Sequence, residues 1–247
     1  LSGQSSVALS FQQPIETFES IALGTLNILE CMRLLNLTAR FFNAASSDSF
    51  GHSDDLMTET SPMRPRSPYA MSKAAAFWTV ANYREAYHLF ACSGILFNHE
   101  SPLRPARFVT QKIVTAAVRI ANGSSERLLL GNLEVFRDWG WAPEYVEAMW
   151  RMLQHDVPTD FIVATGETHS LRMFVELAFH AVGLNWNDHV DIDHRLFRPT
   201  DLIKIRANPE KIARELGWRA TTRFHEIIHE MVRSEHELQS GRLSGLA

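Results

Sequence analysis

The chain has 247 residues, of which 45% are hydrophobic and 21% charged, and its formal net charge at pH 7 is -4. This composition is typical of a globular protein, and the charge balance does not favour a nucleic-acid or anionic membrane surface. No apolar run is long enough to span a bilayer. Cys31 and Cys92 lack metal-type spacing, which suits a reducing compartment. We therefore expect a cytoplasmic protein with no nucleic-acid or membrane partner.

The first half of the chain predicts two helices and two strands. Apolar residues recur at helical spacing over about residues 15 to 36. The apolar run ARFFNAAS then predicts a buried strand that ends in small polar residues. Ser67 can cap a following helix and Pro68 suits its first position, so we expect a helix from Pro68 to about Leu89. SGILFNHESP predicts the next strand.

The second half continues the alternation of helices and strands. Helical segments are expected in FVTQKIVTAAVRIANG, APEYVEAMWRMLQHD, HSLRMFVELAFHAVG, NPEKIARELGW and TTRFHEIIHEMVRSEHEL, and strands in RLLLGN and DFIVATG. This order predicts the α/β class with a mainly parallel sheet. In such sheets, sites lie at the carboxyl ends of the strands. The polar stretches NAASSDS and NHES are therefore expected to line a site.

The stretch SPYAMSKAAAFW places Tyr69 and Lys73 four residues apart, on one face of the expected helix. A lysine ammonium beside a phenol favours the phenolate, so we expect the pKa of Tyr69 to be lowered. A tyrosine tuned in this way can exchange a proton with a sugar or alcohol oxygen. The same spacing also occurs on solvated helix faces, where the pair has no chemical role.

Seven segments together resemble the GDP-mannose 4,6-dehydratases, which are extended short-chain dehydrogenase/reductases: NAASSDSFG, SPYAMSKAAAFW, GILFNHESP, FVTQKI, LLLGNLEVFRDWGWAPEYVEAMW, ATGETHS and FRPTD. The resemblance runs from about Gln4 to Glu237. It implies a lyase of GDP-fucose biosynthesis that converts GDP-D-mannose to GDP-4-dehydro-6-deoxy-D-mannose through transient hydride transfer to NADP+. It also implies a homodimer or homotetramer, in which the helix over residues 15 to 36 and the Tyr69 helix usually form the interface.

The resemblance assigns roles to individual residues. Ser46 would hydrogen-bond the sugar O4, and Asp48 would remove the C5 proton where the family usually has Glu. Tyr69 would be the base at O4, and Lys73 would tune Tyr69 and hold the nicotinamide ribose. The implied binding residues are Asn98 and His99 near the sugar and cofactor, with Thr110, Lys112, Gly131, Arg137, Arg198 and Asp201 at the GDP site.

Simpler roles are also open for these residues. Asn98 could cap a strand end, and Arg137 could pair with Asp138 on the surface. Two departures from the family stand out: Asp48 is one methylene shorter than Glu, and SPLRPARF replaces SPRRGENF, which puts Arg107 in the place of an Asn.

The glycines form no G-x-G-x-x-G or G-x-x-G-x-x-G turn. The resemblance therefore implies a partial NAD(P)-binding Rossmann-type doubly wound parallel sheet without its first three strands, and a smaller C-terminal substrate-binding lobe. Residues 1–100 would form the C-terminal half of the cofactor domain. Residues 101–247 would mainly form the GDP-sugar lobe, with some segments returning to the sheet. We expect a fragment of a longer gene product. The alternative is an inactive truncated relative that dimerises or binds a GDP-sugar.

HEIIHEM matches the H-E-x-x-H signature of zinc proteases through His225, Glu226 and His229. A metalloprotease needs a third ligand, and Val232 stands where the longer signature needs Gly. DHVDIDHR is also rich in metal-ligand types, but alternate residues of a strand point to opposite faces, so we expect a solvated edge strand there. No metal is therefore expected.

Overall fold

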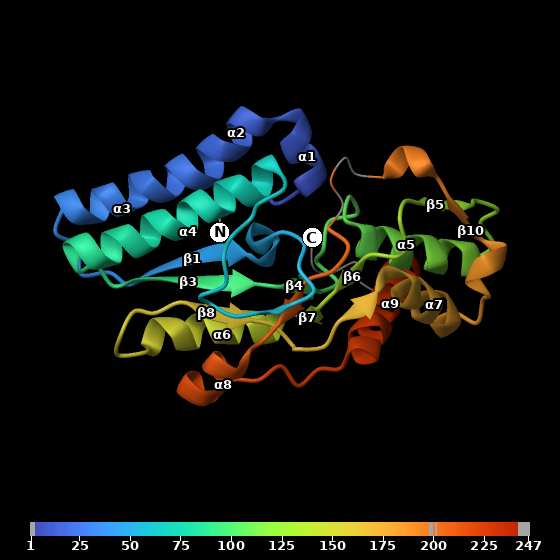
Figure 1. Ribbon diagram of the computed structural model, residues 1–247. Coiled ribbons are helices and arrows are strands. Elements are labelled where there is room, and N and C mark those ends of the chain that lie inside the picture. Colours follow the sequence, from blue (N-terminus) through green and yellow to red (C-terminus); the bar gives the residue numbers. More distant parts are fainter. Residues whose placement is uncertain (1–2, 198–199, 201, 242–247) are drawn as a thin grey trace.

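A computed structural model describes residues 3–197, 200 and 202–241 (Figure 1). At its centre is a parallel sheet of three strands in the order β1 (Phe41–Ser46), β3 (Ala91–Leu96) and β8 (Phe161–Val163). All of β3 and β8 is buried, as expected for parallel strands that are covered on both faces. The α/β class and the parallel sheet predicted from the sequence are therefore confirmed.

Helices cover both faces of this sheet (Figure 1). α4 (Pro68–Tyr87) packs against β1 and β3 on one face, with α3 (Gly24–Leu34) beside it. α6 (Ala142–Gln154) packs against the same two strands from the other face, where α8 (Glu210–Leu216) contacts β8. The sheet is therefore doubly wound, as predicted.

The helix predicted over residues 15 to 36 is present, but a π-helical turn interrupts it. The segment runs as α2 (Pro14–Phe18), the π turn η1 (Glu19–Leu23) and then α3. A short helix, α1 (Val7–Gln12), precedes this segment and was not predicted from the sequence. A π turn holds more residues than an α turn and so rotates the side chains that follow it.

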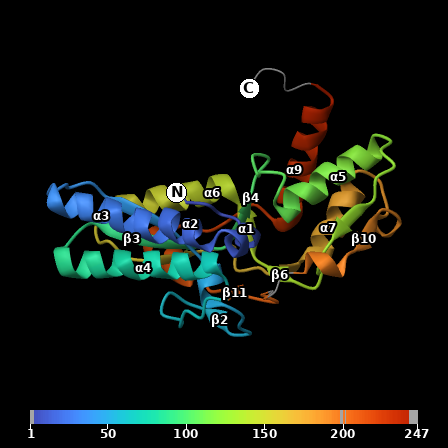
Figure 2. The same cartoon turned by 90° about the horizontal axis from the view of Figure 1, so that it is seen from above.

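Three helices form a smaller lobe beyond the carboxyl ends of the strands (Figure 2). α5 (Val109–Ala121), α7 (Leu171–Ala181) and α9 (Phe224–Gln239) pack on one another around a shared apolar core. β5 (Leu128–Leu130) and β10 (Val190–Ile192) pair in parallel at the rim of this lobe. The predicted strand around DHVDIDHR is thus one strand of a two-stranded pair.

Three further short pairings lie outside the central sheet. They are β2 (Leu56–Met57) with β11 (Arg206–Ala207), β4 (Asn98–Glu100) with β7 (Trp139–Trp141), and β6 (Phe136–Arg137) with β9 (His169–Ser170). The 3-10 turns are η2 (Ser47–Phe50), η3 (Trp186–Asp188) and η4 (His194–Leu196). Because β4 follows directly on β3, this network extends the carboxyl end of the sheet toward the lobe.

Helix ends follow the signals present in the sequence. Gly123 and Gly183 come just after α5 and α7 with φ of 97° and 76°, backbone values that favour glycine. α4 ends one residue before His88, which adopts φ of 56°, so its end lies close to the one predicted at Leu89. None of the described helices combines the length and the apolar character needed to cross a bilayer.

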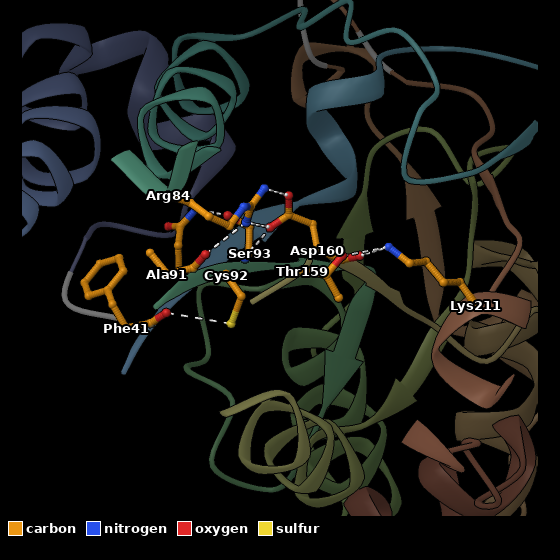
Figure 3. A network of polar contacts seen from close by, with 9 residues as sticks. Phe41, Arg84, Ala91, Cys92, Ser93, Thr159, Asp160 and Lys211 are labelled. Carbon is orange, nitrogen blue, oxygen red and sulfur yellow. Dashed lines mark hydrogen bonds and ion pairs between the residues drawn. The ribbon is translucent and has the colours of Figure 1, made fainter. Parts of the chain in front are cut away.

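A partly buried polar network ties the C-terminal half of α4 to the sheet (Figure 3). The Arg84 guanidinium donates to both carboxylate oxygens of Asp160, at 2.9 and 2.7 Å. Asp160 also accepts the Ser93 N–H at 2.7 Å, and Arg84 donates to the Ala91 carbonyl at 2.9 Å. A two-point arginine–carboxylate pair fixes orientation as well as distance. This network therefore holds the C-terminal half of α4 to the start of β3 and to Asp160, the residue before β8.

Candidate active site

The N-terminal end of α4 carries Tyr69 and Lys73. The Ser67 hydroxyl accepts the N–H of Ala70 at 3.1 Å, so the cap predicted from the sequence is confirmed. The Lys73 ammonium donates to the carbonyl oxygen of Ala44 at 2.8 Å and lies 5.7 Å from the centroid of the Tyr69 ring. Because Ala44 belongs to β1, this bond holds the Tyr69 helix against the sheet.

Ser46 and Asp48 meet Tyr69 where β1 ends. Ser46 is the last residue of β1, and Asp48 lies in the 3-10 turn that follows. The Ser46 hydroxyl accepts the Asp48 N–H at 3.3 Å, and its side chain also hydrogen-bonds the phenol of Tyr69. The fold thus brings together a hydroxyl, a carboxylate and a phenol from two elements.

The pKa of Tyr69 is raised above its ordinary value, mainly by burial and then by the Asp48 carboxylate. The hydrogen bond from Ser46 and the charge of Arg104 act in the opposite direction. Our expectation of a lowered pKa is therefore wrong for this structure, and Lys73 is not the cation that favours the phenolate. Burial lowers the pKa of Lys73 to about 8.

Asn98 and His99 lie on β4, at the carboxyl end of the sheet. His99 Nδ1 is 2.9 Å from the Phe97 carbonyl oxygen, and its ring lies 4.9 Å, centroid to centroid, from that of Tyr145. Since a carbonyl oxygen can only accept, the proton of a neutral imidazole belongs on Nδ1. Burial lowers the pKa of His99, so the neutral ring is favoured.

The GDP-site candidates come from the smaller lobe. Thr110 lies in the first turn of α5, and Lys112 Nζ donates to the Leu129 carbonyl at 2.7 Å. A side chain at Gly131 would bring its Cβ to 3.0 Å from the Leu196 carbonyl oxygen. Arg137 Nη1 donates to the Phe136 carbonyl at 2.7 Å.

Asp138, the alternative surface partner of Arg137, is buried rather than exposed. Its carboxylate accepts N–H bonds from Thr165 at 3.0 Å and from Gly166 at 2.8 Å. Burial still raises the pKa of Asp138 to about 6. The hypothesis of a surface pair with Arg137 is therefore wrong.

All the predicted site residues that the structure describes line one cavity of about 510 Å³. They are Ser46, Asp48, Tyr69, Lys73, Asn98, His99, Thr110, Lys112, Gly131 and Arg137. Arg198 and Asp201 lie outside the described residues. The cavity opens between the carboxyl end of the sheet and the smaller lobe, so residues far apart in sequence share one wall.

Four charged residues of this cavity were not among the predicted site residues: Arg66, Glu100, Arg104 and Arg107. Of these, Glu100 is only 1% exposed. A charged residue at the end of the apolar run GILFNHE was the available signal, but burial cannot be seen in a sequence. The segment before α1 also lines the cavity, through Gly3, Ser5 and Ser6.

The H-E-x-x-H residues lie on α9, where the two histidines are exposed and the glutamate caps the helix. His225 and His229 are exposed, and Glu226 accepts the backbone N–H of Arg223 at 2.6 Å, as a capping residue does. In the part of the chain that the structure describes, no group of three or more His, Cys, Asp or Glu could hold a metal ion. In DHVDIDHR, the other stretch rich in metal-ligand residue types, Asp191 forms an ion pair with Arg127.

Comparison with known proteins matches most of this chain to one family. The family model for GDP-mannose 4,6 dehydratase matches residues 1–231. GDP-mannose 4,6 dehydratase 1 of Arabidopsis thaliana is 47% identical over 242 residues, which cover 96% of this chain and 67% of the relative. The chain thus spans about two thirds of the length of the curated relatives that it matches.

Two solved structures share the fold at lower sequence identity. RMD from Pseudomonas aeruginosa, complexed with NADPH, is 22% identical with a TM-score of 0.87, and the match covers 96% of this chain and 80% of that one. DesIV, a dTDP-glucose 4,6-dehydratase from Streptomyces venezuelae with NAD and TYD bound, is 22% identical with a TM-score of 0.88. That match covers 98% of this chain and 73% of DesIV.

Proposed function

The chain belongs to the GDP-mannose 4,6-dehydratase family, and from this premise we propose that its cavity binds GDP-D-mannose and carries the proton-transfer residues of the dehydration. The product would be GDP-4-dehydro-6-deoxy-D-mannose. The observation that carries the proposal is the single cavity shared by the Tyr69 group and the candidate GDP-binding residues. Catalysis and nucleotide binding need such a shared space, because the sugar and the diphosphate belong to one molecule.

The residues around Tyr69 fit a nicotinamide cofactor, which we propose to be NADP. Lys73 offers an ammonium, Asn98 an amide and His99 a ring nitrogen along the cavity wall, and these groups suit ribose hydroxyls and a carboxamide. The two structural neighbours were solved with NADPH or NAD. When bound, NADP+ would supply the acceptor for the hydride from C4 and its return to C6.

In the proposed mechanism, this chain's residues move protons and hold the sugar. Tyr69 removes the proton from O4 of mannose, and Ser46, which already hydrogen-bonds the phenol, also binds O4. Asp48 removes the proton from C5 and transfers it to the C6 hydroxyl, which leaves as water. Lys73 holds the ribose beside Tyr69, and the carbonyl oxygen of Ala44 keeps the Lys73 ammonium in place.

Cationic side chains of the cavity wall would receive the diphosphate. Arg137, Lys112 and Arg107 all line the cavity. A guanidinium matches phosphate oxygens with paired N–H groups, so arginine suits this task. We accordingly propose that residues 101–247 mainly bind the GDP-sugar while residues 1–100 serve the cofactor.

The experiment is a calorimetric titration of the purified chain with GDP-mannose and with NADP+, followed by an assay for the 4-keto sugar. We expect Tyr69→Phe to lose turnover while GDP-mannose affinity stays within about twofold, since the phenol is needed for proton transfer. Tyr83→Phe is the matched control, because Tyr83 lies on the same helix and donates to Glu30 at 2.9 Å, outside the cavity. Normal turnover in Tyr69→Phe would overturn the mechanism. Absence of GDP-mannose binding by the wild-type chain would overturn the proposed ligand.

A further inference from the structure

Glu100 is a buried carboxylate at the end of β4 for which the proposed mechanism has no role. Its Oε2 accepts a hydrogen bond from the Thr110 hydroxyl at 2.8 Å and lies 3.3 Å from Nε of Arg104. Thr110 belongs to the first turn of α5, whereas Arg104 lies within the segment of residues 101–108 that joins β4 to α5. One oxygen therefore contacts the connecting segment and the helix that follows it.

Among the residues that the structure describes, the connecting segment makes few other hydrogen bonds to the rest of the fold, one of them from Arg104 Nη1 to the His99 carbonyl at 3.4 Å. Within it, Arg104 donates its N–H to the Ser101 carbonyl at 3.0 Å and Phe108 to the Pro105 carbonyl at 3.0 Å. These are local turn bonds, and Leu103 between them is 90% exposed. A segment held mainly by local bonds opens easily, so a buried long-range contact has a large effect on its position.

The same segment supplies two cations to the cavity wall. The guanidinium carbons of Arg104 and Arg107 lie 3.9 and 5.1 Å from the centroid of the Phe108 ring, and both arginines line the cavity. The charge of Arg104 lowers the pKa of both Tyr69 and His99. The position of Arg104 therefore influences the proton affinity of the proposed base.

We propose that Glu100 is a positioning residue that clasps residues 101–108 through Arg104 and Thr110, and so fixes where the Arg104 guanidinium lies in the cavity wall that it shares with Tyr69. The inference rests on the proposed function only in taking this cavity as the GDP-mannose site. An uncharged side chain could accept from Thr110, so the hydrogen bond alone does not require a carboxylate. A buried carboxylate is costly unless it is paired, and Arg104 supplies the pairing charge.

Glu100 changes its protonation state within a pH range in which the protein can be studied. Burial raises its pKa to about 7, while Arg104 and Thr110 act to lower it. Its neighbour on β4 is His99, whose lowered pKa favours the neutral ring and whose ring packs against that of Tyr145 on α6. Strand β7 places uncharged Trp141 opposite Glu100. The clasp should therefore be tight above pH 7 and loosen below it.

The first measurement is hydrogen–deuterium exchange of residues 101–108 in Glu100→Gln and in Glu235→Gln. Glu235 is the matched control, because it is also buried, accepts from Gln111 of α5 at 2.8 Å, and does not line the cavity. At pH 8 we expect exchange in this segment to rise roughly tenfold in Glu100→Gln and to stay unchanged in Glu235→Gln. Unchanged exchange in Glu100→Gln would overturn the clasp.

The second measurement is the affinity for GDP-mannose from pH 6 to pH 8.5, by titration calorimetry. We expect Glu100→Gln to bind roughly tenfold more weakly at pH 8, with the difference shrinking at pH 6, because the wild-type carboxylate is then protonated. A purely structural role would give a difference that does not depend on pH, and that result would overturn the proposal.

The two proposals fail in different ways. If the wild-type chain does not bind GDP-mannose, the proposed function fails, and the exchange of residues 101–108 still decides whether Glu100 is a clasp. If Glu100→Gln does not fold, Arg104→Met removes the other charge of the pair from a more exposed position. The same increase in exchange is then expected, and its absence would overturn the clasp.

Discussion

The Lys73 ammonium donates to the carbonyl oxygen of Ala44 at 2.8 Å and so joins the Tyr69 helix to the first strand of the sheet. This bond places a cation close to Tyr69, yet the larger influences on the phenol are its burial and the Asp48 carboxylate. Lys73 therefore serves first as a connection between two elements. Its proposed contact with the cofactor ribose uses a side chain that is already held in place.

Lys73 should make stability depend on pH in a defined window. Its folded pKa of about 8 lies below its ordinary value of 10.5. Between these values the unfolded chain binds more protons than the folded one, so this group makes the folded state more stable as pH rises. Relative to Lys73→Met, the wild-type protein should gain about 1–3 kcal/mol of unfolding free energy from pH 7.5 to 10. Urea unfolding of both proteins tests this, and a constant difference would contradict it.

The Arg84–Asp160 pair should contribute strongly to stability. Asp160→Asn removes the charge opposite a guanidinium that is mostly buried, so we expect a loss of about 2–4 kcal/mol in unfolding free energy. Asp191→Asn is the matched control, since its pair with Arg127 is about half exposed, and it should cost less than about 1 kcal/mol. Equal losses in the two variants, measured by urea denaturation, would show that burial of the first pair has no special effect.

The length of the side chain at position 48 should limit the rate. Asp48→Glu moves the carboxylate one methylene further into the cavity, and a general base must come within about 2.6–3.2 Å of the group that it serves. We expect turnover of GDP-mannose to rise up to about tenfold with little change in affinity, while Asp48→Asn loses turnover. A fall in turnover with Glu would mean that the cavity is already fitted to Asp.

The faces of α3 and α4 should form a dimer interface. Ile28 on α3 is 47% exposed and Trp78 on the adjacent α4 is 61% exposed, and large exposed apolar side chains are typical of a contact site. Trp78→Glu should convert a dimer to a monomer in sedimentation analysis. Trp150→Glu is the matched control, because Trp150 is equally exposed but lies on α6, across the sheet. Dissociation by the control instead would place the interface on the opposite face.

Local features of the sequence predicted much of this fold, because they have local causes. The cap at Ser67 and the glycines after α5 and α7 act within a few residues, so the bounds of these helices were close to those predicted. The π turn in the first long helix was not predicted, since an apolar pattern does not show a single inserted residue.

The candidate site was predictable as a set of residues but not as an electrostatic environment. The polar ends of β1 and β4 indicated where side chains would gather, and the resemblance added the rest of the cavity lining. The direction of the Tyr69 pKa shift depends on burial by segments far away in sequence. Glu100 was missed for the same reason, because its contacts with Thr110 and Arg104 exist only in the folded chain.

The cavity takes its walls from two regions that pack separately: the apolar clusters around the sheet, and the apolar core among α5, α7 and α9. A molecule that spans the cavity contacts both regions, so its binding opposes any motion that draws them apart. The unfolding free energy of the whole chain then depends on ligand concentration, and it rises by about 2.7 kcal/mol when the ligand is at a hundredfold excess over Kd. Melting curves recorded against a panel of sugar nucleotides would rank them by affinity without any need for turnover.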